Sequence, residues 1–508
     1  MFLLLLCLGS IFLVIYNFAM TSLASLYIVG DLGSSFRLVS YSVSLFGLGN
    51  LITLPLSLGF YRQVGTRRLI LVLLAIFALA SYGAGLAPDF STFVFFRFLQ
   101  GAGGGPLFVL MVVYFQHFGT EKMKEHLVNY VLVIFITAST VGAAIGGTLA
   151  YEANWRYSFL IDGALITLIF FLFRFAMRNS ETPREKHPFD WKGYIAFVLA
   201  VTGPCLFGIL GEWLDWFRSF PLTLMLTVGF FSLLYFIFHA KHRKEEPLFQ
   251  FSLLRRPGKL FALAALFVIF SSYFGTILLI SLWLRLYVNY SIQWVSVLLG
   301  MMALSTGVLF FSIRLSSHRH RLYLLVLAAA LLCASALQTT YFNVEVNFGR
   351  IAVTRLMEGF SFALALPPII SLLLDGLQQE ERPSMFMFFQ ITRVFASTFG
   401  AFFYTTLWYR RDDFYHSRFT EPLNRFSGVF EGFLHRVQGY GAPSQSSLEM
   451  LDNLVEKQAE CQALRDCYFF IFCVVALFLI ATLIYFFFGR VCKKRDSAPK
   501  EAQKPTTA

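Results

Sequence analysis

The sequence predicts an all-α integral membrane protein with about fourteen transmembrane helices. Of its 508 residues, 57% are hydrophobic and only 14% are charged, and the mean hydropathy is positive. A soluble chain of this size cannot bury so much apolar surface, so the excess is expected to face lipid. Apolar segments of about 20 residues recur along the chain, and most basic residues lie in the gaps between them.

Membrane-spanning helices are expected at each of these segments, because a helix needs about 20 residues to cross about 30 Å of hydrocarbon with its backbone groups paired internally. The first segment is too long for a secretion signal and has no basic stretch before it, so we expect it to remain in the membrane. The expected segments are 3–29, 38–60, 69–87, 91–116, 128–150, 157–177, 192–211, 220–239, 260–285, 293–314, 322–340, 350–374, 385–408 and 468–489.

The distribution of Lys and Arg predicts that both ends of the chain are cytoplasmic, because short cytoplasmic loops carry more of these residues than external ones. Alternate gaps are basic, whereas the opposite short gaps contain only Arg37, Arg156, Arg218, Arg285 and Arg350. The segment 409–467 would be a long external loop, to which this rule does not apply. Short helices are expected within it near 421–437 and 446–464. The tail 491–508 is expected to be disordered in the cytoplasm.

Several other classes of protein are excluded. The formal net charge of +12 comes from scattered short loops, without the basic face that nucleic-acid binding requires. Nucleophile motifs, phosphate loops and metal-ligand clusters are missing from the sequence. We therefore expect neither an enzyme nor a cofactor or metal. Cys461 and Cys467 lie together in the expected external loop, where an oxidising compartment would allow a disulfide between them.

Two similar patterns indicate an internal repeat. Arg97-Phe-Leu-Gln100-Gly101 lies in the fourth expected helix, and Arg355-Leu-Met-Glu358-Gly359 lies in the twelfth. In each case a basic stretch, 62–68 or 314–319, closes the helix two before it. Duplicated bundles of this kind place the substrate path between the two halves of many transporters.

Longer motifs indicate a family. These are Arg97-x-x-Gln100-Gly101-x-x-x-Gly105-Pro106 in the fourth helix, Gly142-x-x-x-Gly146-Gly147 in the fifth, the loop containing Gly65 and Arg67, and the stretches 155–161, 214–217, 392–400 and 407–411. Together they resemble the major facilitator superfamily, and within it the 14-span drug:proton antiporters of the EmrB/QacA type. The resemblance covers nearly the whole chain.

This resemblance implies a major facilitator fold with two six-helix bundles, 1–190 and 246–490, and two inserted helices in 191–245. It also implies proton-coupled efflux of lipophilic or amphipathic compounds, as in multidrug export, at a bacterial inner membrane. The expected partners are the lipid bilayer, a small lipophilic substrate and protons, together with a periplasmic adaptor protein and an outer-membrane channel.

The sequence departs from the family pattern at positions that matter for proton coupling. The family usually has an aspartate in the first helix where this chain has Asn17, and commonly an asparagine where this chain has Asp162. Arg62 replaces the acidic residue before Gly65, and Ala143 replaces a proline. An alternative function is therefore a facilitator or uptake carrier for a metabolite or lipid without proton antiport. A third is a membrane-embedded scaffold that acts through its external loop.

Ionisable side chains within the expected helices are the main candidate functional residues, since each costs several kcal/mol in hydrocarbon unless it is paired or hydrated. Arg97, Asp162 and Glu358 are candidates for proton coupling. The alternatives are a fixed ion pair of Glu358 with Arg355 or Arg97, a hydrogen-bonding role of Asp162 near the helix entrance, and a helix-packing role of Arg97. The candidates for the substrate path are Asn17, Gln100, Arg355 and Arg393. The glycines and Pro106 of the motifs are expected to permit close packing and sliding of helices.

Overall fold

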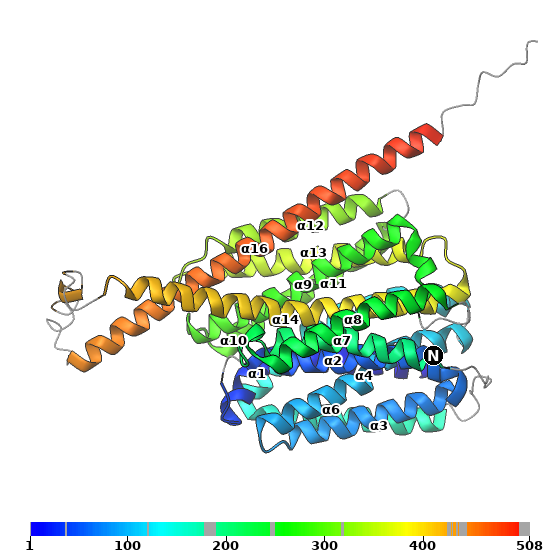
Figure 1. Ribbon diagram of the computed structural model, residues 1–508, viewed down its shortest axis with the longest axis horizontal. Coiled ribbons are helices and arrows are strands. Elements are labelled where there is room, and N and C mark those ends of the chain that lie inside the picture. The colour runs from blue at the N-terminus through cyan, green and yellow to red at the C-terminus, as the bar shows by residue number, and fades with distance from the viewer. Residues whose placement is uncertain are drawn as a thin grey trace, which may run out of the picture.

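Long helices run side by side through most of the protein (Figure 1). The computed structural model describes all residues except 1, 36–37, 119–120, 177–188, 244–248, 316–319, 424–427, 429, 433–434, 436–443 and 497–508. The elements within the described residues are all helices. This confirms the predicted all-α class for that part of the chain.

The helices follow the predicted apolar segments closely. The first group is α1 (Phe2–Asp31), α2 (Val39–Val64), α3 (Thr66–Gly85), α4 (Phe90–Phe118), α5 (Glu121–Leu149), the π-helical turn η2 (Ala150–Asn154) and α6 (Trp155–Ala176). The next is α7 (Trp191–Leu210), η3 (Trp216–Arg218), α8 (Phe220–His242) and η4 (Phe251–Arg255). The last is α9 (Pro257–Leu286), α10 (Ile292–Met301), η5 (Met302–Leu304), α11 (Ser305–Leu315), α12 (Arg321–Thr339), α13 (Phe348–Leu374), η6 (Gln379–Glu381), α14 (Arg382–Thr420) and α16 (Ser444–Asp496).

Twelve helical segments among the described residues are long and apolar enough to cross a membrane. One of them, Asn129–Ala176, contains parts of two of the predicted spans joined through η2. A further predicted span is divided into the shorter helices α10 and α11 by the turn η5. The chain is therefore a multi-pass membrane protein, and the number of fourteen crossings stays a prediction.

The chain reverses direction at η2. The sequence positions of contacting residues rise in the same direction along α1 and α5, as in the pairs Tyr16 with Gly142 and Met20 with Gly146. Along α1 and α6 they run in opposite order, as in the pairs Asn17 with Asp162 and Asp31 with Trp155. Thus α5 is parallel to α1 and α6 is antiparallel to it, so the segment of 48 residues holds two antiparallel helices.

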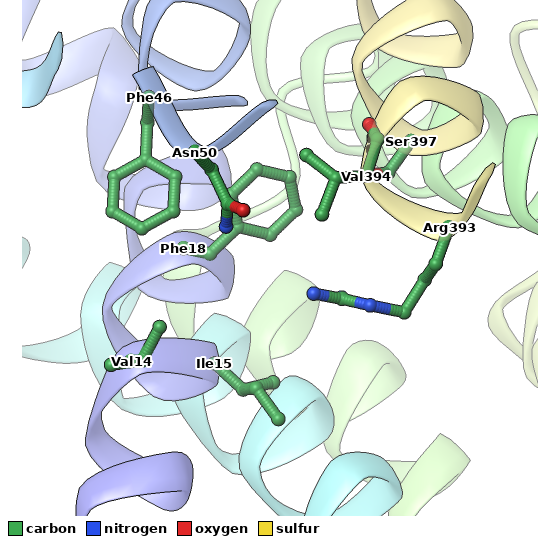
Figure 2. A pocket seen from close by; sticks show the side chains of 8 residues that line it. All are labelled: Val14, Ile15, Phe18, Phe46, Asn50, Arg393, Val394 and Ser397. Atoms are coloured by element: carbon green, nitrogen blue, oxygen red, sulfur yellow. Dashed lines mark hydrogen bonds between the residues drawn. The ribbon is translucent and has the colours of Figure 1, made fainter. Parts of the chain in front are cut away.

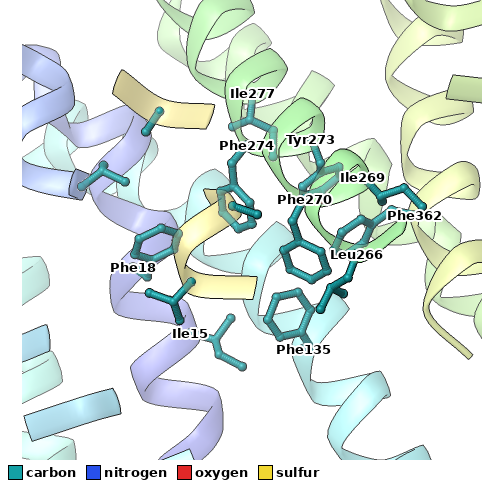
Figure 3. Close-up of a cluster of buried hydrophobic side chains, with 14 of the residues drawn as sticks. Ile15, Phe18, Phe135, Leu266, Ile269, Phe270, Tyr273, Phe274, Ile277 and Phe362 are labelled. Carbon is teal, nitrogen blue, oxygen red and sulfur yellow. The ribbon is translucent and has the colours of Figure 1, made fainter. Parts of the chain in front are cut away.

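Two groups of helices meet along an apolar interface. Helices α1 to α6 pack on one another, as do α9 to α14 with α16. Helices α7 and α8 form a pair, of which α7 contacts α2 and α14. Contacts between the groups join α2 with α14, α5 with α10, and α1 with α9. Phenylalanine rings from α1, α5, α9 and α13 converge there (Figure 3). The residue limits predicted for the two bundles and the inserted helices stay predictions.

The expected external loop 409–467 is helical over much of its length, in longer helices than the short ones expected, and its place outside the membrane stays a prediction. α14 contains 39 residues and would be about 58 Å long at 1.5 Å per residue, nearly twice the thickness of hydrocarbon. It continues to Thr420, and α16 begins at Ser444. Figure 1 shows these ends projecting beyond the other helices. Asp466 of α16 accepts hydrogen bonds from Arg411 at 2.7 Å and Tyr415 at 2.8 Å, which holds the two extensions together.

The other end of α16 also differs from the prediction. The helix continues to Asp496, so residues 491–496 of the expected disordered tail are helical, and 497–508 lie outside the described residues. A short helix expected near 446–464 is part of α16. Another, expected near 421–437, falls largely outside the described residues.

The disulfide between Cys461 and Cys467 is not formed, and both residues are free thiols. They are six positions apart on one continuous helix, which separates their Cα atoms by about 9 Å, more than a disulfide can bridge. The Cys461 thiol lies 3.6 Å from the carbonyl oxygen of Phe342, and the Cys467 thiol lies 4.0 Å from that of Tyr404. The two side chains therefore contact different segments, the connection between α12 and α13 for Cys461 and helix α14 for Cys467.

Close packing of α5 on α1 yields a prediction for Gly146. A Cβ added there would lie 2.5 Å from the backbone oxygen of Met20, whereas one added at Gly307 would meet nothing within 4 Å. Gly146→Ala is expected to lower the melting temperature of the purified protein by several degrees, because overpacking costs about 1–3 kcal/mol. Gly307→Ala is the matched control and should melt as the wild type does. Equal melting of the two variants would contradict the close approach.

Candidate functional site

A buried network of polar side chains joins α1, α3, α4 and α6. Arg97 Nη1 donates hydrogen bonds to Asn17 Oδ1 and, at 2.7 Å, to Gln100 Oε1. Asn17 Nδ2 donates to Asp162 Oδ2 at 2.7 Å, and Gln100 Nε2 donates to Ser81 Oγ at 2.8 Å. Ser81 Oγ donates in turn to Asp162 Oδ2 at 3.1 Å. We call these five residues the Asp162 network.

The two oppositely charged side chains of the Asp162 network, Arg97 and Asp162, are not directly bonded to each other. Asn17 lies between the guanidinium of Arg97 and the carboxyl of Asp162, and it bonds to both. Arg97 also lies over the ring of Phe46, with 4.6 Å between its Cζ and the ring centroid. Among the described residues, Asp162 Oδ1 and Arg97 Nη2 are buried without a hydrogen-bond partner. One carboxyl oxygen of Asp162 is therefore available to carry a proton.

A second buried network joins α9, α12, α13 and α16. Arg355 Nη1 lies 2.6 Å from Glu358 Oε2, and Arg355 Nη2 donates to Glu358 Oε1 at 2.8 Å. The hydroxyls of Thr276 and Ser335 each donate to the same carboxylate at 3.2 Å. The hydroxyl of Tyr468 accepts from Arg355 Nη2 at 3.3 Å. In this Glu358 network the arginine and the carboxylate form a direct ion pair, and both carboxylate oxygens have partners.

The two networks occupy corresponding places in the two halves. Each is built around an arginine from one copy of the repeated motif, and the helices that contribute correspond in order along the chain. The position of the acid differs. Three residues after the arginine stands Gln100 in one half and Glu358 in the other. The last helix of each half supplies Asp162 or Tyr468. Both copies of the repeat thus contain the arginine, but the carboxyl lies on the last helix of the first half, α6, and on the arginine's own helix, α13, in the second half.

Arg393 on α14 stands apart from both networks, at the interface between the halves. It is buried, its Nε donates to Gln390 Oε1 at 2.9 Å, and its guanidinium lies over the rings of Phe135 and Phe108, at 5.0 and 5.9 Å from their centroids. Beside it is a cavity of about 10 Å³ (Figure 2), lined by Val14, Ile15, Phe18, Phe46, Asn50, Arg393, Val394 and Ser397. That volume holds about one water molecule.

The candidate residues of the sequence are therefore divided among three places. The structure brings Asn17 and Gln100, considered for the substrate path, together with the proton-coupling candidates Arg97 and Asp162. Arg355 joins Glu358 in the second half. Of the four substrate-path candidates, Arg393 alone lines the cavity between the halves.

Five further polar residues were missed by sequence reasoning. Four of them complete the two networks and one lines the cavity: Ser81, Thr276, Ser335, Tyr468 and Asn50. Uncharged polar residues of these types are common in transmembrane helices, where they bond to their own backbone or to a neighbouring helix. No charge or motif distinguishes them in the sequence.

The motif glycines and their neighbours lie where helices approach closely. Gly65 separates α2 from α3 and has φ of 93°, a backbone conformation that favours glycine. Arg67 Nη2 donates to the backbone oxygen of Arg174 at 3.0 Å, which joins α3 to the end of α6. Three motif residues are on α4: Gly101 and Gly105, which lie against the backbone of α2, and Pro106. Gly142, Gly146 and Gly147 lie against α1. The contribution of these contacts to sliding stays a prediction.

Comparison with known proteins decides the family. The family model for the Major Facilitator Superfamily matches residues 6–401. The chain belongs to the major facilitator superfamily. This membership confirms that the protein is a membrane transporter and not an enzyme, as the sequence predicted.

Relatives in this superfamily include exporters from several bacteria. The chain is 24% identical to the multidrug export protein EmrB of Escherichia coli strain K12 over 423 residues, covering 83% of this chain and 82% of that protein. It is 23% identical to EmrB of Haemophilus influenzae, over 91% and 90% of the two chains. It is 22% identical to the fatty acid resistance protein FarB of Neisseria gonorrhoeae, over 88% and 89%.

Solved transporter structures share the fold. The POT family transporter PepTSo has a TM-score of 0.58 at 12% identity, covering 94% of this chain and 97% of that one. The human organic anion transporter MFSD10 has a TM-score of 0.55 at 13% identity, covering 93% and 98%. These similarities confirm the predicted major facilitator fold.

The direct ion pair of the Glu358 network gives a stability prediction. Arg355→Met alone leaves a buried carboxylate without its counter-ion, which costs about 3–5 kcal/mol. The double variant Arg355→Met/Glu358→Leu removes both charges, so it should melt at a higher temperature than the single variant. A double variant that melts below the single one would show that the pair is not the main interaction at this site.

Proposed function

We propose that this protein is a proton-coupled exporter of lipophilic or amphipathic compounds in a bacterial inner membrane, with both termini in the cytoplasm. The relatives described as multidrug export and fatty acid resistance proteins support export of such compounds. The observation that carries the proton coupling is the Asp162 network. It holds a carboxyl among α1, α3 and α6 with one oxygen lacking a partner among the described residues.

Asp162 is the proton-carrying residue in this proposal, and Arg97 responds to its charge through Asn17. The ionised carboxyl accepts the hydrogen bond of Asn17 and attracts the guanidinium beyond it. Protonation removes that negative charge, so the chain of bonds from Arg97 through Asn17 to Asp162 weakens. Because the three residues belong to α4, α1 and α6, the change acts directly on the packing of those helices.

The contact between Asn17 and Asp162 accounts for two departures from the family pattern at once. The family usually has aspartate at the position of Asn17 and commonly asparagine at that of Asp162. The two side chains are joined by a hydrogen bond of 2.7 Å, so acid and amide have exchanged places across one contact. The site therefore keeps a carboxyl, and the loss of the first-helix aspartate does not argue against proton coupling.

The exchange can be tested by reversing it. Asp162→Asn should reduce efflux driven by a pH gradient in proteoliposomes at least about tenfold while substrate binding stays within about threefold, because the carrier of the proton is lost. The double variant Asn17→Asp/Asp162→Asn should recover most of the efflux. Glu358→Gln is the comparison in the other half, and it should retain a response to the gradient.

Two results would contradict this assignment. Wild-type efflux from Asp162→Asn would remove Asp162 from the mechanism. Substrate exchange by the unmodified protein that is indifferent to an imposed pH gradient would favour the facilitator or uptake carrier instead.

We also propose that the projecting ends of α14 and α16 contact a periplasmic adaptor protein, which would connect the exporter to an outer-membrane channel. The two extensions are joined by the contacts of Asp466. Beyond these, Leu448, Met450 and Leu454 of α16 are about half exposed. Exposed apolar side chains on a projecting helix are suited to packing against another helix.

The adaptor proposal predicts different effects on transport by the purified protein and on the drug resistance of whole cells. Leu448→Glu/Leu454→Glu should leave transport in proteoliposomes unchanged, because these residues are far from the halves' interface. The same variant should lower resistance of cells to a lipophilic drug at least about fourfold if an apolar contact of the size expected for two leucines is lost. Glu449→Gln, at the same end of α16, is the control. Unchanged cellular resistance would contradict the role of this surface.

A further inference from the structure

We propose that Arg393 binds the anionic headgroup of the transported compound, so that the preferred substrate is a lipophilic carboxylate. This inference rests on the proposed export function, because it names the substrate class for the path between the halves. It follows from the position of Arg393, from the charges around it and from the nature of the surrounding side chains.

Arg393 lies where a molecule between the halves would be held. In Figure 2 its side chain extends from α14 toward Ile15 of α1, across the cavity that both helices line. Its guanidinium also lies over Phe108 of α4 and Phe135 of α5. The residue therefore belongs to one half of the protein and contacts mainly the other half.

The charge of Arg393 is not balanced, in contrast to the other arginines at the centres of the helices. Arg355 is paired with Glu358, and Arg97 is linked to Asp162 through one amide. Among the described residues, no carboxylate forms an ion pair with Arg393, and Gln390 is its sole hydrogen-bond partner. Aromatic rings stabilise a buried cation less than an ion pair does. A bound anion would supply the missing charge.

Asn50 provides a second polar group at the same cavity. Its side chain is 2% exposed, and its Oδ1 has no hydrogen-bond partner in the described part of the chain. This oxygen lies against Gly105 of α4, where an added Cβ would be 2.3 Å from it. An ionised carboxylate has no hydrogen to donate to it. The charge of Arg393 therefore carries the recognition of the anion, and Asn50 adds a polar side chain to the wall of the cavity.

Apolar rings surround these two polar groups. The ring centroids of Phe18 on α1 and Phe274 on α9 are 5.1 Å apart. Those of Phe135 on α5 and Phe270 on α9 are 5.4 Å apart. Figure 3 shows these rings converging with Phe362 of α13. Such walls suit the apolar body of an amphiphile. The cavity of about 10 Å³ is too small for that body, so the halves must separate at these rings to admit it.

The test uses three fluorescent probes with one naphthalene-alkyl body and a carboxylate, a primary amide or an ammonium as headgroup. Binding is measured with the purified full-length protein in phosphatidylcholine nanodiscs. The wild type should bind the carboxylate at least about tenfold more tightly than the amide, and the ammonium most weakly, because only the anion balances the buried guanidinium. Arg393→Gln should bind carboxylate and amide within about twofold of each other, and Arg393→Lys should keep part of the preference.

The amide probe reports whether each variant is folded, because its binding does not require the charge. Should Arg393→Gln fail to fold, Arg393→Lys and the wild-type selectivity carry the test. Equal binding of carboxylate and amide by the wild type, or an unchanged preference in Arg393→Gln, would overturn the proposal.

Two further measurements identify the source of the anion and distinguish failure of this inference from failure of the proposed function. Competition by phosphatidylglycerol in the nanodiscs, lost in Arg393→Gln, would support an anionic ligand and identify it as a membrane lipid. Gradient-driven efflux of the amide and ammonium probes without carboxylate selectivity would overturn the inference and leave proton-coupled export standing. Carboxylate selectivity without any response of efflux to pH would support Arg393 and contradict the proton coupling.

Discussion

The requirement that charged side chains in hydrocarbon find partners inside the protein governs this structure. Water cannot satisfy them at that depth, so each arginine within the helices must be matched by an acid, an amide, a ring or a ligand. Arg355 has a direct acid partner, Arg97 reaches its acid through Asn17, and Arg393 has none among the described residues. We propose that these three degrees of compensation correspond to three different tasks: holding helices, responding to a proton and receiving a substrate.

The two halves show how one repeated motif can serve unequal purposes. In the Glu358 network both carboxylate oxygens are bonded, and the arginine is in direct contact with them. Such an arrangement resists change because breaking it exposes two unpaired charges to the interior. In the Asp162 network one carboxyl oxygen lacks a partner in the described chain, and a neutral amide separates the charges. This arrangement changes more easily, which suits the half that is proposed to titrate.

The sequence predicted the helical class, most helices and the charged residues, but not their partners. Arg97, Asp162 and Glu358 could be identified because a charge within an apolar run is rare. Whether Glu358 pairs with Arg355 or Arg97 depends on which helices are neighbours, and composition carries no information on that. The segment 409–467 was expected to be a loop because it is polar, yet contacts such as Arg411 with Asp466 extend the helices beyond the apolar region. That same continuity of α16 keeps Cys461 and Cys467 apart.

The most direct test of this account is infrared difference spectroscopy of the carboxyl groups in the reconstituted protein as the external pH is changed. A protonated carboxyl band that appears and disappears with pH, and that is missing from Asp162→Asn but present in Glu358→Gln, is the result expected here. A band that persists in Asp162→Asn and is lost in Glu358→Gln would contradict the assignment, because it would place the titrating proton in the half that this account regards as fixed.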